Sequence, residues 1–178
     1  MAKRIVLLVG KSGSGKSTIA NKLEDDYGLS QVLSYTTRPI RDGEYDNPTH
    51  TFVTDEEFNE LTNLVGYTEF NGYKYCATSQ QIEDNDIYVI DPDGVEYMRE
   101  HYSGNKEVVV VYIDCPDSVL MDRMLERGDD FLDAYERFQH DRSKFAKGKK
   151  MADYVYDNID RSSLVWICEK IFRIVVDT

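Results

Sequence analysis

A glycine-rich stretch near the amino terminus, residues 10–18, constrains the fold of this chain more than any other part of its sequence. It fits the pattern G-x-x-x-x-G-K-[ST] at every defined position. The run I-V-L-L-V at residues 5–9 is apolar and rich in β-branched side chains, which is typical of a strand buried on both faces. After the stretch, Ile19, Ala20 and Leu23 recur at helical spacing. The sequence therefore predicts a strand, a tight turn and a helix, which is the order found around a phosphate-binding loop.

The physical chemistry of such a loop favours an anion. Glycines carry no Cβ, so the backbone N–H groups approach a phosphate closely, and the start of the following helix adds the positive end of its dipole. Within this pattern Lys16 reaches the β- and γ-phosphates, and the Ser17 hydroxyl ligates Mg²⁺. The loop is therefore predicted to bind a nucleoside triphosphate, ATP with Mg²⁺, through Gly10, Lys11, Ser12, Gly13, Ser14, Gly15, Lys16, Ser17 and Thr18.

Composition limits the classes of partner. A chain of 178 residues is expected to form one domain, and its net charge of −12 argues against nucleic acid as the main ligand. No apolar stretch reaches the length of a membrane span, and the first four residues lead directly into a core strand, which argues against a signal peptide. Cys76, Cys115 and Cys168 are far apart and are expected to be reduced thiols of a cytoplasmic protein. Nothing in the sequence indicates an oligomeric state.

Apolar runs alternate with helical patterns at both ends of the chain. Strands are expected at 4–9, 87–91, 107–113 and 154–157, and helices at 16–25, 94–101, 117–127 and 162–176. This alternation predicts an α/β fold in which a mostly parallel sheet has helices on both faces.

Two segments interrupt this alternation. Residues 34–86 contain short strand-like runs at 35–37, 51–53 and 73–75, and a capping box that begins at Thr54 and opens a helix to about Leu64. We interpret them as a small mixed or mainly antiparallel insertion, and residues 128–147 as a helical lid. The core of a single domain would then comprise residues 1–33, 87–127 and 148–178.

Several motifs together resemble those of guanylate kinases. They are the glycine-rich loop, S-Y-T-T-R-P-I-R-D-G-E at residues 34–44, F-V-T-D-E-E-F at 52–58, N-G-Y-K-Y at 71–75, R-G at 127–128 and D-Y-V at 153–155. They occur in order over nearly the whole chain, and the string at 34–44 is the most specific of them. The resemblance implies a P-loop nucleoside monophosphate kinase, with a core, a GMP-binding insertion and a lid. Its activity would be Mg²⁺-assisted phosphoryl transfer from ATP to GMP or dGMP.

Arginines suit this reaction, because two polyanions must be held in line while negative charge spreads over the transferred group. Arg123 and Arg127 are four residues apart and share one helix face. The resemblance implies that Arg38, Arg41 and Tyr75 hold the acceptor phosphate. It further implies that Arg123, Arg127 and Arg137 close on the triphosphate and that Asn158 lies near the adenine. The residues expected to act in catalysis are Lys16, Arg38, Arg127 and Arg137.

The positions that would read the base depart from the family pattern. Ser34 and Asp91 match positions that contact guanine, whose N1–H and amino group need acceptors such as a carboxylate. A family tyrosine at the acceptor phosphate is replaced by His50, and a family hydroxyl is replaced by Ala77. The family's guanine-reading glutamate falls at Gly66, which leaves Glu69 as a possible substitute.

These departures leave alternatives open. The chain can be a kinase for another nucleoside or deoxynucleoside monophosphate, or a ribose-bisphosphate kinase on the same fold. A non-catalytic guanylate-kinase-like module that binds phosphopeptides is a third alternative. The intact loop residues Gly15-Lys16-Ser17 argue against it.

Overall fold

The computed structural model describes residues 3–40, 50–126, 128 and 130–177. Arg41 and Arg127, which the sequence assigns to phosphate binding, lie outside the described residues. A search of the described residues finds no helix that is both long enough and apolar enough to span a membrane.

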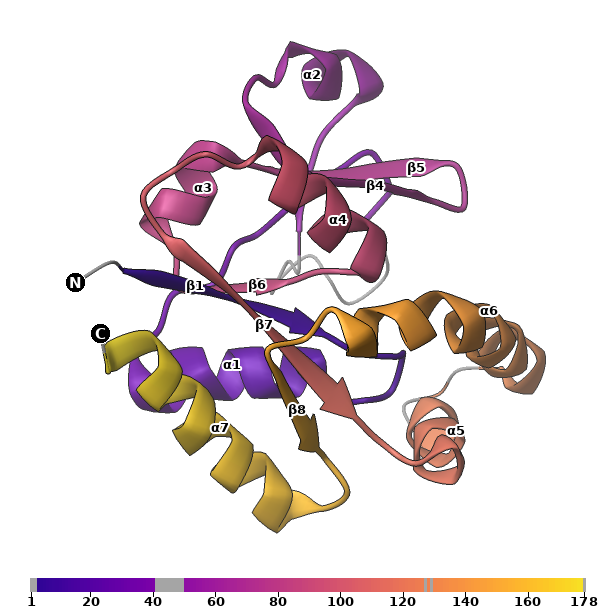
Figure 1. Ribbon diagram of the computed structural model, residues 1–178. Coiled ribbons are helices and arrows are strands. Elements are labelled where there is room, and N and C mark those ends of the chain that lie inside the picture. The colour runs from indigo at the N-terminus through magenta and orange to yellow at the C-terminus, as the bar shows by residue number, and fades with distance from the viewer. Residues whose placement is uncertain (1–2, 41–49, 127, 129, 178) are drawn as a thin grey trace.

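A four-stranded parallel sheet with the strand order β6-β1-β7-β8 lies at the centre of the molecule (Figure 1). Its strands are β1 (Arg4–Val9), β6 (Ile87–Val89), β7 (Glu107–Asp114) and β8 (Tyr154–Asp157). Successive side chains of a strand point to opposite faces, and β1 is apolar on both. Ile5, Leu7 and Val9 enter one buried cluster, whereas Val6 and Leu8 enter the other. The predicted α/β fold with a mostly parallel sheet is confirmed.

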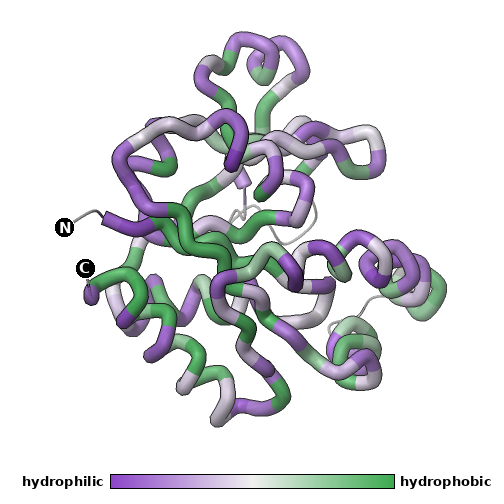
Figure 2. The backbone as a smooth tube through the Cα atoms, in the orientation of Figure 1, coloured by the Kyte–Doolittle hydropathy of each residue, from purple (hydrophilic) through white to green (hydrophobic). Residues whose placement is uncertain are grey.

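Helices cover both faces of this sheet (Figure 1). On one face, α1 (Lys16–Tyr27) and α7 (Arg161–Val176) bury Ile19 and Ile167 against β1 and β7. On the other face, α4 (Pro92–His101) buries Val95 and Met98 in the cluster that contains Ile5. Figure 2 shows the apolar central strands enclosed by these amphipathic helices. The remaining helices are α2 (Asp55–Glu60), α3 (Ser79–Asp84), α5 (Asp117–Glu126) and α6 (Phe131–Lys150).

A second sheet, of strand order β3-β2-β5-β4, is formed by residues between α1 and α3. Its strands are β2 (Tyr35–Thr36), β3 (Thr51–Phe52), β4 (Leu64–Phe70) and β5 (Tyr73–Thr78). The β2–β3 pair is parallel, and the β2–β5 and β4–β5 pairs are antiparallel. β4 and β5 are joined at Asn71 and Gly72, with φ values of 50° and 77°. Positive φ at both central residues is the requirement of a type I′ hairpin turn, which Asn-Gly meets.

β4 was not predicted from the sequence. The helix expected to run to about Leu64 ends at Glu60, because Leu61 is already extended (ψ 140°). Asn63 then takes a positive φ of 54°, and the strand begins at the next residue. Gly66 interrupts the apolar alternation of β4, which hides the strand from a periodicity argument.

Gly66 lies at a crowded point between the two sheets. Its φ is +65°, and a Cβ built there would lie 2.9 Å from Tyr88 Cε1 and 3.0 Å from Ile90 Cδ1. Tyr88 and Ile90 come from the end of β6 and are themselves buried. A larger residue at position 66 must therefore displace buried side chains as well as strain the backbone.

We predict that Gly66→Ala destabilises the fold by about 1–3 kcal/mol more than Gly72→Ala. Gly72 is the matched control, because its φ is also positive (+77°) but a Cβ there has no heavy atom within 4 Å. Both substitutions place a Cβ on a backbone with positive φ, but only the Cβ of Gly66→Ala comes too close to Tyr88. Denaturant unfolding of the two variants and the wild type gives the comparison; equal losses of unfolding free energy would contradict the packing described here.

Candidate active site

The glycine-rich loop follows β1 and ends at the first turn of α1. Gly13 and Gly15 have φ values of +79° and +91°, a conformation that L side chains rarely adopt. A Cβ at Gly10 would lie 2.5 Å from the Ile113 carbonyl oxygen at the end of β7. Gly15 is the N-cap of α1 and offers no side chain to its N–H groups. The loop is thus closely wound, and the N–H groups at the start of α1 receive no side-chain cap from Gly15.

Lys16 folds back over this loop. Its ammonium donates to the backbone oxygens of Gly10 (2.5 Å) and Lys11 (2.9 Å). Backbone carbonyl oxygens therefore hold the ammonium against the loop. Lys16 also lines both of the pockets described next, and so stands where they meet.

The first pocket, which we call the loop pocket, has a volume of about 580 Å³. It brings together predicted nucleotide-binding residues from the loop, α5, α6 and the end of β8, namely Ser12, Gly13, Gly15, Lys16, Ser17, Thr18, Arg123, Arg137 and Asn158. Of the other loop residues, Ser14 is buried and Lys11 pairs with Asp117 at 2.8 Å.

Two residues of the loop pocket also support the loop itself. The Asn158 amide is buried and donates to the Ser14 carbonyl oxygen at 2.8 Å. Arg123 donates to the Ile159 carbonyl oxygen at 3.1 Å and to that of Gly13 at 3.4 Å. Both side chains therefore fix the shape of the loop as well as lining the pocket.

The second pocket, which we call the sheet pocket, has a volume of about 250 Å³ and lies between the two sheets and α6. Four predicted substrate-binding residues line it: Ser34, His50, Tyr75 and Asp91. Ser34 Oγ lies 2.8 Å from His50 Nδ1, and the ring centroids of His50 and Tyr75 are 5.6 Å apart. Residues from β5, the end of β6 and the segments flanking β2 and β3 thus converge on one cavity.

Two further predicted residues are placed elsewhere. Arg38 is buried, with its guanidinium 5.2 Å from the centroid of the Phe52 ring and a hydrogen bond of 2.9 Å to the Pro39 carbonyl oxygen. Glu69 lies on the face of β4 opposite to Thr68 and Phe70, which line the sheet pocket. Its carboxylate there accepts a hydrogen bond from the Tyr67 hydroxyl. Burial, with this hydrogen bond, raises the pKa of Tyr67 to about 12. The structure therefore does not bring Glu69 together with Ser34 and Asp91.

Tyr88 takes up space that a side chain at position 66 would need. It lines the sheet pocket together with Ser34. Burial raises the pKa of Tyr88, so the hydroxyl remains protonated and polar at the base of the pocket. Sequence reasoning missed Tyr88, because a tyrosine within an apolar strand is normally a core residue.

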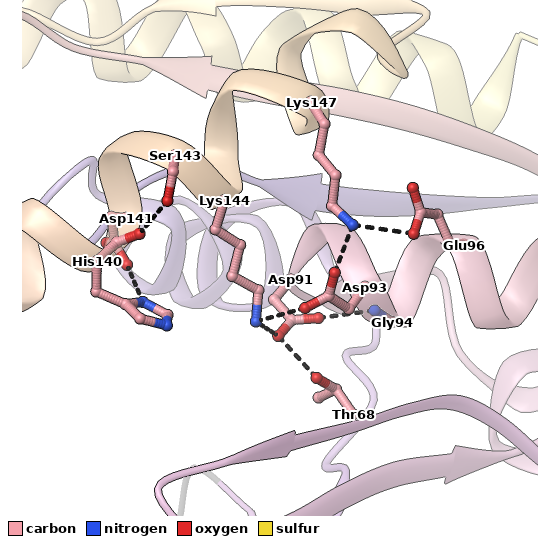
Figure 3. Close-up of polar contacts among 10 residues, drawn as sticks. All are labelled: Thr68, Asp91, Asp93, Gly94, Glu96, His140, Asp141, Ser143, Lys144 and Lys147. Atoms are coloured by element: carbon pink, nitrogen blue, oxygen red, sulfur yellow. Dashed lines mark hydrogen bonds and ion pairs between the residues drawn. The ribbon is translucent and has the colours of Figure 1, made fainter.

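Sequence reasoning also missed three residues of α6. His140, Asp141 and Lys144, which Figure 3 labels on α6, all line the sheet pocket, and so does Phe145. Asp141 is buried and accepts a hydrogen bond of 2.7 Å from the backbone N–H of Ser12 in the glycine-rich loop. The spacing of residues 140, 141 and 144 on a helix puts them on one face, which is the signal that was available.

Lys144 joins α6 to the carboxylates at the start of α4. Its ammonium lies 2.6 Å from Asp91 Oδ2 and 2.9 Å from Asp93 Oδ2, as Figure 3 shows. Burial works to lower the pKa of Lys144, but the hydrogen bonds and charges of the two carboxylates outweigh it and raise the pKa. Asp93 is affected in the opposite sense: burial works to raise its pKa, but Lys147 and Lys144 hold it below its usual value. Lys144 and Asp93 are therefore both charged at neutral pH.

Comparisons with known proteins agree with one another. The family model described as guanylate kinase matches residues 2–175. A guanylate kinase of Helicobacter pylori is 27% identical over 166 residues, which cover 88% of this chain and 80% of that protein. A guanylate kinase of Anaplasma phagocytophilum is 34% identical over 143 residues, or 71% of this chain and 65% of that protein.

Solved structures give the same result. A crystal structure of guanylate kinase from Anaplasma phagocytophilum superposes with a TM-score of 0.67 at 27% identity, covering 97% of this chain and 84% of that one. A shikimate kinase from Bacteroides thetaiotaomicron matches with a TM-score of 0.51 at 15% identity, over 99% of this chain and all of that chain, which shows the fold alone. The match of the family model over nearly the whole sequence is decisive: this chain belongs to the guanylate kinase family.

Proposed function

We propose that this chain transfers the terminal phosphoryl group of ATP to GMP or dGMP, giving ADP and the nucleoside diphosphate. The observation that carries the proposal is the position of Lys16, which lines both the loop pocket and the sheet pocket. Phosphoryl transfer needs donor and acceptor phosphates in line, with a cation at the transferred group. A lysine at the junction of two pockets meets that requirement.

The loop pocket is the proposed site of ATP. The N–H groups at the start of α1, which have no side-chain cap from Gly15, would bind the β- and γ-phosphates, and Arg123 and Arg137 would balance their charge. Asn158, beyond the loop, would border the adenine. Arg127 would join the other arginines, in keeping with the family resemblance.

The sheet pocket is the proposed site of the acceptor. Ser34 and Asp91 would contact the base, with His50 and Tyr75 toward the acceptor phosphate. Arg38 and Arg41 would bind that phosphate, as the family resemblance implies. The unit formed by residues 34–86 would then be the monophosphate-binding part, and residues 128–147 would form the lid over ATP.

Magnesium fits this arrangement through the nucleotide. Among the residues that the structure describes, no three His, Cys, Asp or Glu side chains form a group able to hold a metal ion. Mg²⁺ at nucleotide sites is held mainly by substrate phosphates and water, so a dedicated cage is not needed. The Ser17 hydroxyl, which lines the loop pocket, is the proposed protein ligand. When bound, the ion would offset the negative charge that develops on the transferred group.

The chemistry also requires little of the protein beyond positioning. A phosphate monoester is largely ionised at neutral pH, because its second pKa is about 6. The acceptor is therefore already a nucleophile, and no side chain has to remove a proton. Lys16 and the arginines would act by holding both phosphates and by stabilising negative charge.

We predict that the chain phosphorylates guanine nucleoside monophosphates selectively. With MgATP in excess, GMP and dGMP should stimulate ADP release far above the rate with ATP alone, and AMP, CMP and UMP should not. Coupled spectrophotometric measurement of ADP over this panel gives the acceptor directly. Ribose 1,5-bisphosphate belongs in the panel, since its use in place of GMP would favour the ribose-bisphosphate alternative. No response to any acceptor would contradict the kinase proposal.

We also predict that turnover depends on the charge of Lys16. Lys16→Met should lower kcat with GMP by roughly 10²- to 10³-fold or more, because it removes a fixed charge from the transferred phosphoryl group. Lys22→Met is the control: it lies on the same helix and pairs with Asp26 at the surface. It should leave kcat unchanged. Thermal melting of both variants checks the fold; a Lys16→Met protein that retains wild-type turnover would show that Lys16 does not act on the transferred group.

A further inference from the structure

Among the described residues that line the sheet pocket, Lys144 is the one lysine that α6 contributes. The other basic side chains of this lining are Lys16, His50 and His140. Its side chain is 13% exposed, and Figure 3 shows it reaching from α6 toward Asp91 and Thr68. A lysine so enclosed, beside the carboxylate proposed to contact the base, bears directly on which base can bind.

The hydrogen-bonding capacity of Lys144 is not exhausted. An ammonium group has three N–H donors. Within the described part of the chain, two of them are accounted for, by Asp91 at 2.6 Å and Asp93 at 2.9 Å. One donor is left at the wall of the pocket.

The capacity of Asp91 is similarly incomplete. A carboxylate has about four lone-pair sites. Asp91 Oδ1 accepts from the Gly94 backbone N–H at 2.7 Å, and Oδ2 accepts from Thr68 Oγ1 at 3.0 Å and from Lys144. The contacts within the described residues therefore leave one acceptor site on Oδ1, the carboxylate oxygen that does not contact Lys144.

We propose, building on the proposed kinase function, that Lys144 is a specificity-determining residue of the sheet pocket. Its ammonium donates to the C6 carbonyl oxygen of the purine, while Asp91 beside it accepts from the adjacent N1–H. This donor–acceptor pair is the complement of a lactam edge, which guanine and hypoxanthine share. Adenine has an amino donor at C6 and an acceptor at N1. The Lys144 donor would therefore meet a donor, and the Asp91 acceptor would meet an acceptor.

A merely structural role for Lys144 is already filled by its neighbour. Lys147, one turn further along α6, pairs with Asp93 at 2.5 Å and Glu96 at 2.9 Å and so ties α6 to α4 outside the sheet pocket. Lys144 and Lys147 share Asp93, but only Lys144 lines the pocket. Lys147 therefore offers a matched control of the same residue type on the same helix.

The experiment is a cycle of two acceptors and three proteins. The value of kcat/KM is measured for GMP and for 6-thio-GMP, whose sulfur is a weaker acceptor than oxygen, with wild type, Lys144→Met and Lys147→Met. The wild type should prefer GMP. In Lys144→Met, kcat/KM for GMP should fall roughly ten- to a hundredfold, as expected for a lost charge-assisted hydrogen bond, and the preference over 6-thio-GMP should disappear.

Three further measurements complete the design. IMP should lose as much as GMP does in Lys144→Met, the KM for ATP should stay constant, and Lys147→Met should keep the wild-type preference. Equal losses for GMP and 6-thio-GMP in Lys144→Met, or loss of the preference in Lys147→Met, would overturn the assignment and leave Lys144 a helix tether. A wild type inactive with GMP would instead contradict the proposed function, and this inference would fall with it.

Discussion

The burial of β1 on both faces is the constraint on which the rest of the structure depends. β1 pairs with β6 and β7, and its alternate side chains enter two separate apolar clusters, so neither its register nor its direction can shift without exposing a core. The glycine-rich loop begins where β1 ends. In parallel α/β sheets, ligands bind in the crevice beyond the carboxyl ends of the strands. Asp91 after β6 and Asn158 after β8 lie at that same edge.

Helix α6 completes the site by contacting both pockets at once. Asp141 accepts a hydrogen bond from the Ser12 N–H of the loop, and Lys144 pairs with Asp91 at the sheet pocket. The two contacts are three residues apart and thus lie on one face of the helix. One face of α6 therefore contacts both the glycine-rich loop and the wall of the sheet pocket.

The central fold and the loop were predictable from the sequence, because each rests on a local signal. The apolar run before Gly10 and the loop pattern predicted β1, the turn and α1, and the structure has all three. The second sheet was harder to predict: Gly66 obscures β4, and the extended backbone of Leu61 ends α2 earlier than the sequence pattern indicates. The side of β4 on which Glu69 lies follows from strand register, which sequence spacing alone did not fix. Tyr88 and Lys144 became visible only through contacts between residues 22 or more positions apart, with Gly66 and Asp91 respectively.

The most direct test of the account is whether one ligand can occupy both pockets through the junction at Lys16. Calorimetric titration with adenosine and guanosine joined 5′ to 5′ by five phosphates, in the presence of Mg²⁺, measures this. One molecule should bind per chain, more tightly than ATP or GMP alone, because linked groups bind at high effective concentration. The bound molecule should also exclude both nucleotides. Binding no tighter than that of ATP, with GMP still able to bind alongside, would contradict the claim that the two pockets form one site for phosphoryl transfer.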